Sequence, residues 1–316
     1  MRRRSVVVFS LSLLMARLCL AGDSCAAREW DGVNGEARAV EPAFRVVRRI
    51  EVTDSPKAYT WPVWSPDGMK LAFTGSNKKG TYVRNADGTG LIREVLSSDQ
   101  WYCPVWSKDS RSLVVERGRS GRYDLIDIET GEVTSVDSRE PFVGGFERNI
   151  HGLTAYYPDD EPPPPDVRLK IDFRNRRMWV IETDGDSDRM TEFPHGISLA
   201  FLSPRRDLVI YKPGNGNMYV SGLDGSSVVN LGRGDMLDWS QDGKRLVYLS
   251  DCRQTHYTVI GYNIFVINAD GSGKTRLMDT PDLVEHYPTW SPDGTRVAYS
   301  THRPGKIYVA VMEEAK

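Results

Sequence analysis

A short motif led by a bulky residue recurs along this chain and constrains its fold more than any other feature. Its two strongest copies read Trp-Ser-Pro-Asp-Gly, and the weaker copies keep the bulky first residue. Six anchor residues align in this way: Trp64, Trp106, Phe146, Leu202, Trp239 and Trp290. Their spacing of 37 to 56 residues indicates one supersecondary unit per copy.

The sequence around each anchor repeats as well. The seventh residue after the anchor opens an apolar strand, as Leu71 does after Trp64 and Val297 after Trp290. A tight turn of Asp-Gly type separates the two strands. A third strand, a second turn and a fourth strand follow, and no stretch shows sustained helical periodicity. The pattern predicts an all-β fold, a six-bladed β-propeller of four-stranded blades.

The two ends of the repeat region complete each other. The last copy supplies only three strands, within residues 288–311, whereas residues 44–52 form an extra strand before the first anchor. If this N-terminal strand pairs in the last blade, it closes the ring and removes the open edges that invite aggregation. We therefore expect one β-propeller domain over residues 44–316.

The first residues are typical of an export signal. Arg2, Arg3 and Arg4 precede an apolar stretch, residues 6–14, that is too short to span a bilayer, and small residues follow. We predict a signal peptide over residues 1–27 and a flexible leader over residues 28–43. An uncleaved anchor is the alternative, which Arg17 disfavours because it interrupts the apolar stretch. The mature protein is then periplasmic or secreted and does not span the membrane.

Charge and cysteine content exclude several classes of protein. The 41 basic and 43 acidic residues nearly cancel, so the composition predicts no nucleic-acid partner and no attraction to an anionic membrane surface. Cys103 and Cys252 are the two cysteines outside the predicted signal, too few for a disulfide framework even in an oxidising compartment. We expect the hydrophobic core to hold the fold, with no cofactor.

The anchors and the Asn-Ala-Asp-Gly turns at residues 85–88 and 268–271 resemble the WD40-like repeat of TolB-type six-bladed propellers. The resemblance covers residues 44–314. It implies the fold rather than one activity, because such propellers occur in envelope scaffolds, in serine peptidases and in sugar-acid lyases. The stretch before Phe44 is too short for the N-terminal domain of TolB, and no Gly-x-Ser-x-Gly nucleophile motif is found.

In blades of this family the anchor strand is innermost, so the residues three and four before each anchor are expected at the mouth of the central tunnel. For five anchors these positions hold Thr60, Trp61, Tyr102, Cys103, Ser198, Leu199, Asp235, Met236, His286 and Tyr287, and the stretch before Phe146 offers Val143 and Gly144. Two long connections, residues 158–170 and 251–262, are expected to open beside the mouth. The prolines at 162–165 in the first are interpreted either as a stiff spacer or as a recognition motif.

The predicted partner-binding residues at the mouth are Trp61, Tyr102, Asp235, His286, Tyr287, His256 and Tyr257. Aromatic side chains with one polar end are common anchors of binding surfaces. The alternative for Trp61 and Tyr287 is that they only fill the tunnel by packing.

These features predict a monomeric, non-catalytic scaffold that binds a protein or a saccharide at the tunnel mouth, with no catalytic or metal-binding residue. The alternative function is a metal-dependent lyase or hydrolase of the oligogalacturonate type, with a metal held by His256, His286 and His302. The resemblance implies this alternative, because lyase relatives bind a divalent ion through histidines.

Overall fold

A computed structural model of the chain describes residues 44–77, 79–99, 104–117, 122–137, 147–149, 152–154, 166–172, 177–184, 187–193, 196–214, 216–255, 258–278, 280, 283–302 and 305–315. All regular structure within these residues is β-strand. They include no helix long and apolar enough to cross a membrane.

Five sheets have four antiparallel strands each, and each is named here by its anchor residue. The Trp64 sheet contains β2 (Tyr59–Trp64), β3 (Lys70–Gly75), β4 (Lys79–Asn85) and β5 (Arg93–Asp99). The Trp106 sheet contains β6 (Val105–Trp106), β7 (Ser112–Arg117), β8 (Arg122–Asp127) and β9 (Val133–Asp137). The Leu202 sheet contains β15 (Ile197–Leu202), β16 (Leu208–Pro213), β17 (Asn217–Gly222) and β18 (Val229–Arg233).

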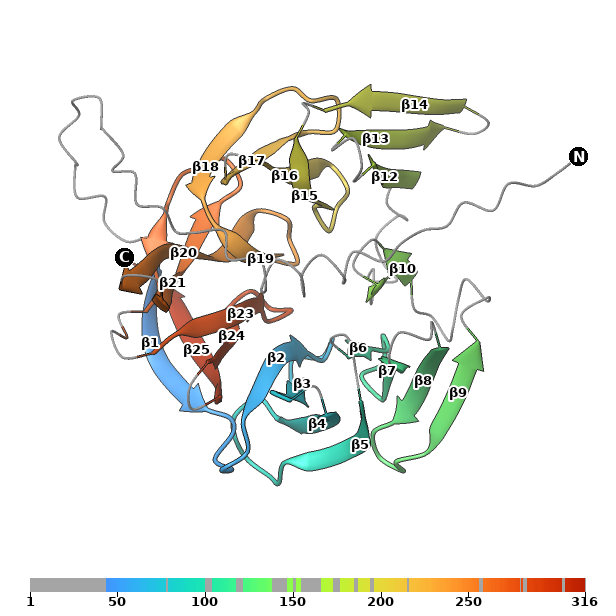
Figure 1. Cartoon of the computed structure of the whole chain (residues 1–316), viewed down its shortest axis with the longest axis vertical. Helices are drawn as coiled ribbons and strands as arrows, with labels where there is room; N and C mark the ends of the chain where they lie inside the picture. Colours follow the sequence, from blue (N-terminus) through green and yellow to red (C-terminus); the bar gives the residue numbers. More distant parts are fainter. Residues whose placement is uncertain are drawn as a thin grey trace, which may run out of the picture.

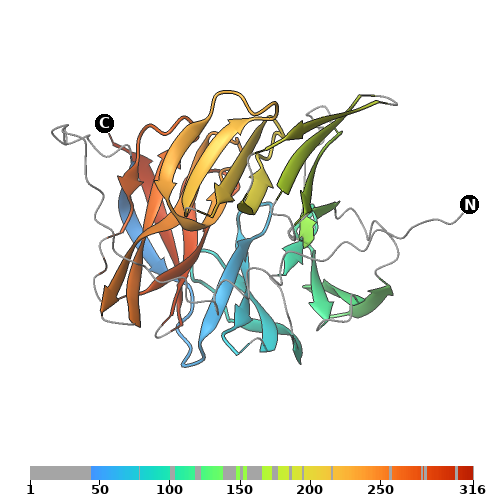
Figure 2. The same ribbon diagram turned by 45° about the horizontal axis from the view of Figure 1, so that its top comes forward.

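The Trp239 sheet contains β19 (Asp235–Trp239), β20 (Arg245–Thr255), β21 (Thr258–Asn268) and β22 (Thr275–Arg276). The Trp290 sheet contains β23 (Glu285–Trp290), β24 (Arg296–Thr301), β25 (Ile307–Glu314) and β1 (Phe44–Glu51). The sheets stand side by side around a common centre (Figures 1 and 2), with β1 along the outside beside β25.

The strand predicted at the seventh residue after each anchor is confirmed in all five of these sheets, and there the anchor pairs with that residue. Trp64 lies opposite Leu71, Trp106 opposite Leu113 and Trp290 opposite Val297. Leu202 and Trp239 pair in the same way with Val209 and Leu246. All five partners are 0% exposed, so the repeat marks the residues at the centre of each sheet's packing.

The serine after each anchor fixes the turn between the two inner strands. Ser65 Oγ donates to Asp67 Oδ1 at 2.6 Å and accepts from the amide of Lys70 at 2.9 Å. The same serine-to-aspartate hydrogen bond recurs at Ser107 and Asp109, Ser240 and Asp242, and Ser291 and Asp293. These serines are buried, and the bonds satisfy hydroxyl groups that would otherwise destabilise the core.

Neighbouring sheets are joined through the anchor tryptophans. Trp106 Nε1 donates to the carbonyl of Val63 at 3.1 Å, and Trp64 Nε1 donates to the carbonyl of Thr289 at 3.2 Å. The guanidinium of Arg296 lies 4.7 Å from the ring centroid of Trp64. The last sheet along the chain therefore packs directly against the first.

The predicted N-terminal strand is confirmed. Phe44 to Glu51 pair antiparallel with β25 from Glu314 to Tyr308, with one irregularity between Val46 and Arg48. This strand is the fourth of the Trp290 sheet, as the strand count in the sequence required.

The third predicted repeat is not one four-stranded sheet among the described residues. Its anchor, Phe146, lies outside them. A two-stranded sheet of β10 (Glu147–Asn149) and β11 (Gly152–Thr154) is followed by a three-stranded sheet of β12 (Asp166–Asp172), β13 (Arg177–Asp184) and β14 (Ser187–Glu192). The expected connection at residues 158–170 is also partly wrong, because β12 begins within it, while the prolines at 162–165 lie outside the described residues.

The expected loop at residues 251–262 is a β-hairpin. β20 and β21 pair antiparallel. The pairing runs from Arg245 opposite Asn268 to Thr255 opposite Thr258, with irregularities in register near Arg253. β19 reaches only to a pairing with Leu249, so the hairpin extends beyond its inner neighbour. Backbone pairing thus continues both strands through the segment that the sequence analysis expected to be a long connection.

Candidate functional site

The start of the inner strand carries the same backbone distortion in three sheets. In β2 two residues, Trp61 and Pro62, lie opposite the single residue Phe73, which makes a β-bulge. The φ angle of Trp61 is 54°, and Met236 and Tyr287, three residues before their own anchors, have φ angles of 49° and 51°. Non-glycine residues are strained in this region, and bulges redirect side chains next to functional sites.

These bulges bring together aromatic side chains from different sheets. The rings of Trp61 and Tyr287 meet edge to face with centroids 5.4 Å apart. The ring of His286 lies 5.8 Å from Tyr287, 5.8 Å from Tyr262 and 5.7 Å from His302. We call these five residues the mouth cluster: Trp61, Tyr262, His286, Tyr287 and His302.

The mouth cluster is neither a sealed core nor a fully solvated surface. Trp61, Tyr262, His286 and Tyr287 are each partly exposed, and His302 is exposed. The side chains come from β2, from β21, from β23 and from the connection after β24. Trp61 and Tyr287 therefore pack on each other and still present area to a partner.

The electrostatics of the mouth cluster are set by His286. Burial, and to a smaller extent the nearby His302, lowers the pKa of His286 to about 4. Its Nδ1 atom is buried without a hydrogen-bond partner among the described residues. The imidazole is therefore neutral at neutral pH.

Of the four remaining predicted residues, the structure describes only Asp235. Asp235 is exposed at the start of β19 and forms an ion pair with Lys212 of β16, which links the Trp239 and Leu202 sheets. Tyr102, His256 and Tyr257 lie outside the described residues. The structure thus brings Trp61, His286 and Tyr287 together. It places Asp235 in an ion pair between the Trp239 and Leu202 sheets instead.

Asp238 was missed by the sequence reasoning. Its Oδ2 accepts hydrogen bonds from Thr289 Oγ1 at 2.8 Å and from the amide of Trp290 at 2.9 Å, so it joins β19 to β23. A small part of the residue is exposed, but protein atoms enclose the carboxylate, and burial raises its pKa to about 6 against the effect of these bonds. A carboxylate inside an apolar strand, directly before an anchor, is the signal that identifies it.

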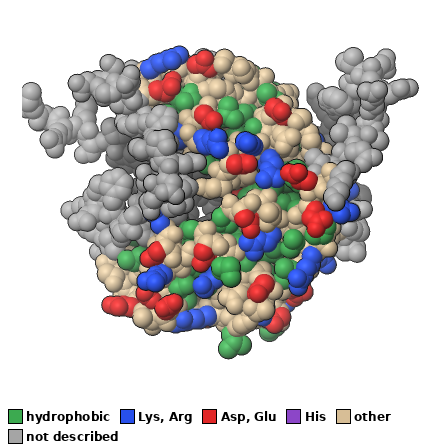
Figure 3. Space-filling view, turned by 180° about the vertical axis from the view of Figure 1, so that it is seen from behind, with side chains coloured by type: hydrophobic (Ala, Val, Ile, Leu, Met, Phe, Trp, Pro, Cys, Tyr) green, Lys and Arg blue, Asp and Glu red, His purple; other side chains and the backbone are tan. Residues whose placement is uncertain are grey.

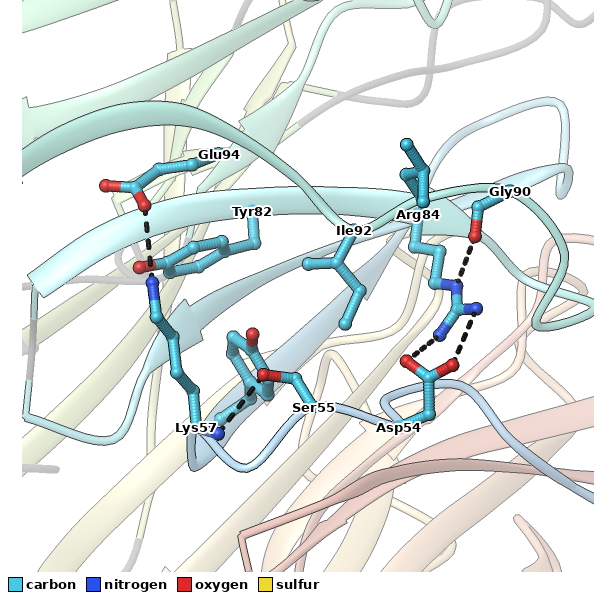
Figure 4. A pocket seen from close by; sticks show the side chains of 10 residues that line it. Asp54, Ser55, Lys57, Tyr82, Arg84, Gly90, Ile92 and Glu94 are labelled. Atoms are coloured by element: carbon cyan, nitrogen blue, oxygen red, sulfur yellow. Dashed lines mark hydrogen bonds and ion pairs between the residues drawn. The ribbon is translucent and has the colours of Figure 1, made fainter.

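A polar pocket of about 330 Å³ lies where the chain crosses from β1 to β2, and it was also missed (Figure 4). Arg84 is its centre. Its guanidinium donates to both Asp54 carboxylate oxygens, at 2.9 and 3.3 Å, to the Gly90 carbonyl at 3.0 Å and to the Val52 carbonyl at 2.5 Å. Because these partners occupy the guanidinium, Arg84 fastens the β1–β2 connection onto the Trp64 sheet rather than facing a ligand.

The histidines of the alternative function are only partly placed. His286 and His302 are neighbours, whereas His256 lies outside the described residues. Within the part of the chain that the structure describes, no three His, Cys, Asp or Glu side chains are grouped so as to hold a metal ion. No observation therefore favours the metal-dependent lyase.

Comparison with known proteins gives two curated relatives. The chain is 24% identical over 305 residues to an uncharacterized protein of Agrobacterium fabrum, covering 86% of this chain and 95% of the relative. It is 31% identical over 79 residues to dipeptidyl-peptidase 5 of Porphyromonas gingivalis. That match covers 25% of this chain, which spans only 11% of the length of the peptidase. No family model matches the chain.

Solved structures support the architecture. The β-propeller domain of Cps50 (Swd1) from Myceliophteria thermophila superposes with a TM-score of 0.55 at 12% identity, covering 84% of this chain and 98% of that domain. TolB from Acinetobacter baumannii has a TM-score of 0.41 at 14% identity, covering 82% of this chain and 65% of that protein, and the TolB-like family stays a prediction. Together with the repeated four-stranded antiparallel sheets, the likeness to the Cps50 domain shows that this chain has a β-propeller fold.

Proposed function

We propose that this chain is an exported, six-bladed β-propeller, closed by β1, that acts as a non-catalytic scaffold and binds a protein partner at the mouth cluster. In this proposal residues 1–27 are a signal peptide, residues 28–43 are a leader, and the mature protein is a monomer in the periplasm or outside the cell. The β-propeller fold suits a scaffold, because a rigid set of sheets can present binding residues on the loops and strand ends that it positions.

The observation that carries the proposal is the strained bulge shared by Trp61 and Tyr287. A left-handed backbone at a bulky residue is unfavourable and persists where the surroundings or the function require it. Here it brings two large aromatic rings from the first and last sheets into contact, partly exposed. Partly exposed Trp and Tyr are the residue types that most often dominate protein–protein binding energy.

The neutral imidazole of His286 favours a protein partner with an apolar contact surface. The low pKa of His286 keeps its imidazole neutral, and Asp235 is already paired with Lys212. An apolar or aromatic side chain of the partner then meets no unpaired buried charge, which would otherwise cost binding energy.

Closure by β1 is supported by the contacts between the first and last sheets. Trp64 donates to the carbonyl of Thr289, and Arg296 donates to the carbonyl of Gly68 at 3.0 Å. Lys306 in the last sheet donates to the carbonyl of Ser55 at 2.9 Å. These bonds join the two ends of the repeat region, and a sixth blade between the Trp106 and Leu202 sheets completes the ring in this proposal.

The test places a photo-crosslinking amino acid at position 61 or 287 and identifies the crosslinked partner by mass spectrometry in intact cells of the source organism. The expected result is one recurrent protein partner, captured from a periplasmic or secreted fraction. Capture of a cytoplasmic protein contradicts the export part of the proposal, and crosslinking to a glycan contradicts the protein partner.

A matched set of variants separates the mouth cluster from the rest of the surface. Trp61→Ala and Tyr287→Ala should each weaken affinity for the identified partner by at least about tenfold, the loss typical of a dominant interface residue. Met69→Ala is the control, because Met69 is a 65% exposed apolar residue in the turn at the other end of β2. Equal affinity for all three variants would reject the mouth cluster as the binding site.

A further inference from the structure

The bulge at the start of the inner strand occurs in three sheets, and a fourth sheet shows the same position without it. Trp61, Met236 and Tyr287, each three residues before its anchor, have left-handed φ angles of 54°, 49° and 51° and are partly exposed. Leu199 holds this position in the Leu202 sheet, has no left-handed φ angle and is 5% exposed. Bulges redirect side chains, and here the left-handed bulge accompanies exposure of the side chain.

The fold does not require this bulge in every sheet. The Leu202 sheet has an irregularity between Ile197 and Leu199 without a left-handed residue, and β15 still pairs with β16 up to its anchor. In two of the three bulges the left-handed residue precedes a proline, Pro62 or Pro288, although a residue before proline favours an extended backbone. Strain that the fold does not need indicates a use for the side chains that it exposes.

The three exposed side chains belong to sheets that stand side by side. β23 lies between β2 and β19 (Figure 1) and contacts both. The rings of Trp61 and Tyr287 meet edge to face. Met236 packs against the core cluster that contains Trp290, so it lies next to the Trp290 sheet. Trp61, Tyr287 and Met236 therefore follow one another around the starts of the inner strands, and we call these three residues the apolar arc.

The apolar arc ends at the Leu202 sheet. There the equivalent residue, Leu199, is buried, and the ion pair of Lys212 with Asp235 joins that sheet to the Trp239 sheet. On the face seen in Figure 3, the described basic and acidic side chains are interspersed rather than gathered by sign, so that face offers no charged field to steer a partner. The exposed side chains thus support an apolar contact that is long and narrow.

We propose that the partner binds the apolar arc with one extended segment, whose apolar side chains meet Trp61, Tyr287 and Met236 in turn. This inference rests on the proposed function and adds to it Met236 and the form of the partner. Packed sheets lie about 10 Å apart, so the path from the first sheet to the third takes about six residues of extended chain at about 3.3 Å each. Such a chain can bend along the arc, whereas a helix of this length is a straight rod about 10–12 Å wide.

The test places a photo-crosslinking amino acid at position 61, 287 or 236 of the full chain, in separate experiments, and maps the crosslinked residues of the captured protein by mass spectrometry. We expect one protein from all three positions. Its crosslinked residues should fall within about ten consecutive residues, in the order of the arc. Gly214, which is exposed directly after β16 in the Leu202 sheet, is the matched control position and should give no crosslink to that stretch.

The outcomes at these positions separate the extended segment from the proposed function. No capture from position 61 or 287 would reject both together. Capture from 61 and 287 without capture from 236, crosslinks scattered over distant parts of the partner sequence, or equal capture from position 214 would reject the extended segment alone.

A synthetic peptide of the crosslinked stretch then measures the contribution of Met236. Met236→Ala should weaken peptide binding by at least about tenfold, and Met236→Leu should retain it, because leucine keeps an apolar side chain of similar volume. Met69→Ala, in an exposed turn, should leave the affinity unchanged. A lower melting temperature of Met236→Ala with unaltered peptide affinity would show that Met236 only packs in the core and would overturn the inference.

Discussion

The glycine that ends the turn after an inner strand has left-handed φ angles of 69°, 66° and 66° at Gly68, Gly243 and Gly294. An alanine Cβ at Gly243 would lie 3.7 Å from Ser203 Cβ, an ordinary contact, whereas one at Gly294 would lie 2.9 Å from Arg245 Nη2. Gly243→Ala should therefore cost only the backbone strain, about 1 to 2 kcal/mol. Gly294→Ala should cost more, because it also displaces the guanidinium that lies 4.9 Å from the Trp290 ring centroid.

Urea unfolding of the two glycine variants checks this prediction. The pair is matched in residue type, turn position and φ angle, so the difference in unfolding free energy isolates the displacement of Arg245. Equal losses of stability in the two variants would mean that the guanidinium moves aside without cost.

Single residues were predictable from the sequence where the repeat fixes their geometry. The offset from the anchors indicated that Trp61 and Tyr287 occupy equivalent positions, and their rings do meet across two sheets. Asp238 was not predictable in this way, because the same position in the other copies holds residues such as Val63 and Phe201. Its role depends on Thr289 and Trp290 of the next sheet, which only the three-dimensional arrangement brings near.

At the scale of strands and turns, the success of the sequence reasoning follows the strength of the repeat. Where a tryptophan or leucine anchor is followed by an apolar strand, the pairing is found as expected. Around residues 147–192 the anchor and its turn are weak, and the described residues form two smaller sheets. The β20–β21 arm was misjudged because pairing between these two strands continues beyond Leu249, the last residue of β20 that pairs with β19.

The link between β19 and β23 through Asp238 should make stability depend on pH. The pKa of Asp238 in the folded protein, about 6, is higher than the ordinary value of 3.8. A raised pKa means that the folded state holds the proton more tightly, so its contribution to stability is complete below pH 4 and is lost as the pH rises through 6. Asp238→Asn keeps an oxygen acceptor for Thr289 and Trp290 and removes this titration.

The expected result is that Asp238→Asn is more stable than the wild type at pH 7.5 by about 1 to 3 kcal/mol, and that this advantage shrinks toward pH 4. Chemical unfolding of both proteins across this range measures it. If the stability difference between Asp238→Asn and the wild type did not change with pH, the pKa of Asp238 would not be raised in the folded protein. The hydrogen bonds from Thr289 and Trp290 would then offset the effect of burial on that pKa.

For the whole molecule, the strand count at the two ends of the repeat region predicted how the first and last sheets meet. β1 comes from the N-terminal side and completes the Trp290 sheet, so the chain must then cross to the Trp64 sheet. The side chains that hold this crossing, Arg84 and Lys306, carry no repeat signal. The role of Arg84 and Lys306 could not be predicted, because they bond backbone carbonyls, such as those of Val52 and Ser55. Every residue has a backbone carbonyl, so the sequence does not mark these partners.

The crossing should be sensitive to the loss of one side chain, Arg84. Arg84 is 9% exposed and bonds the carbonyls of Val52 and Gly90, so Arg84→Met leaves acceptors without a donor and should cost about 2 to 4 kcal/mol. Arg45→Met removes only the exposed ion pair between Arg45 of β1 and Glu313 of β25 and should cost less than about 1 kcal/mol.

Limited proteolysis should accordingly release a fragment ending between β1 and β2 sooner in Arg84→Met than in Arg45→Met or the wild type. Identical cleavage rates and unfolding free energies for the two variants would show that pairing of β1 with β25 alone secures the joint between the first and last sheets.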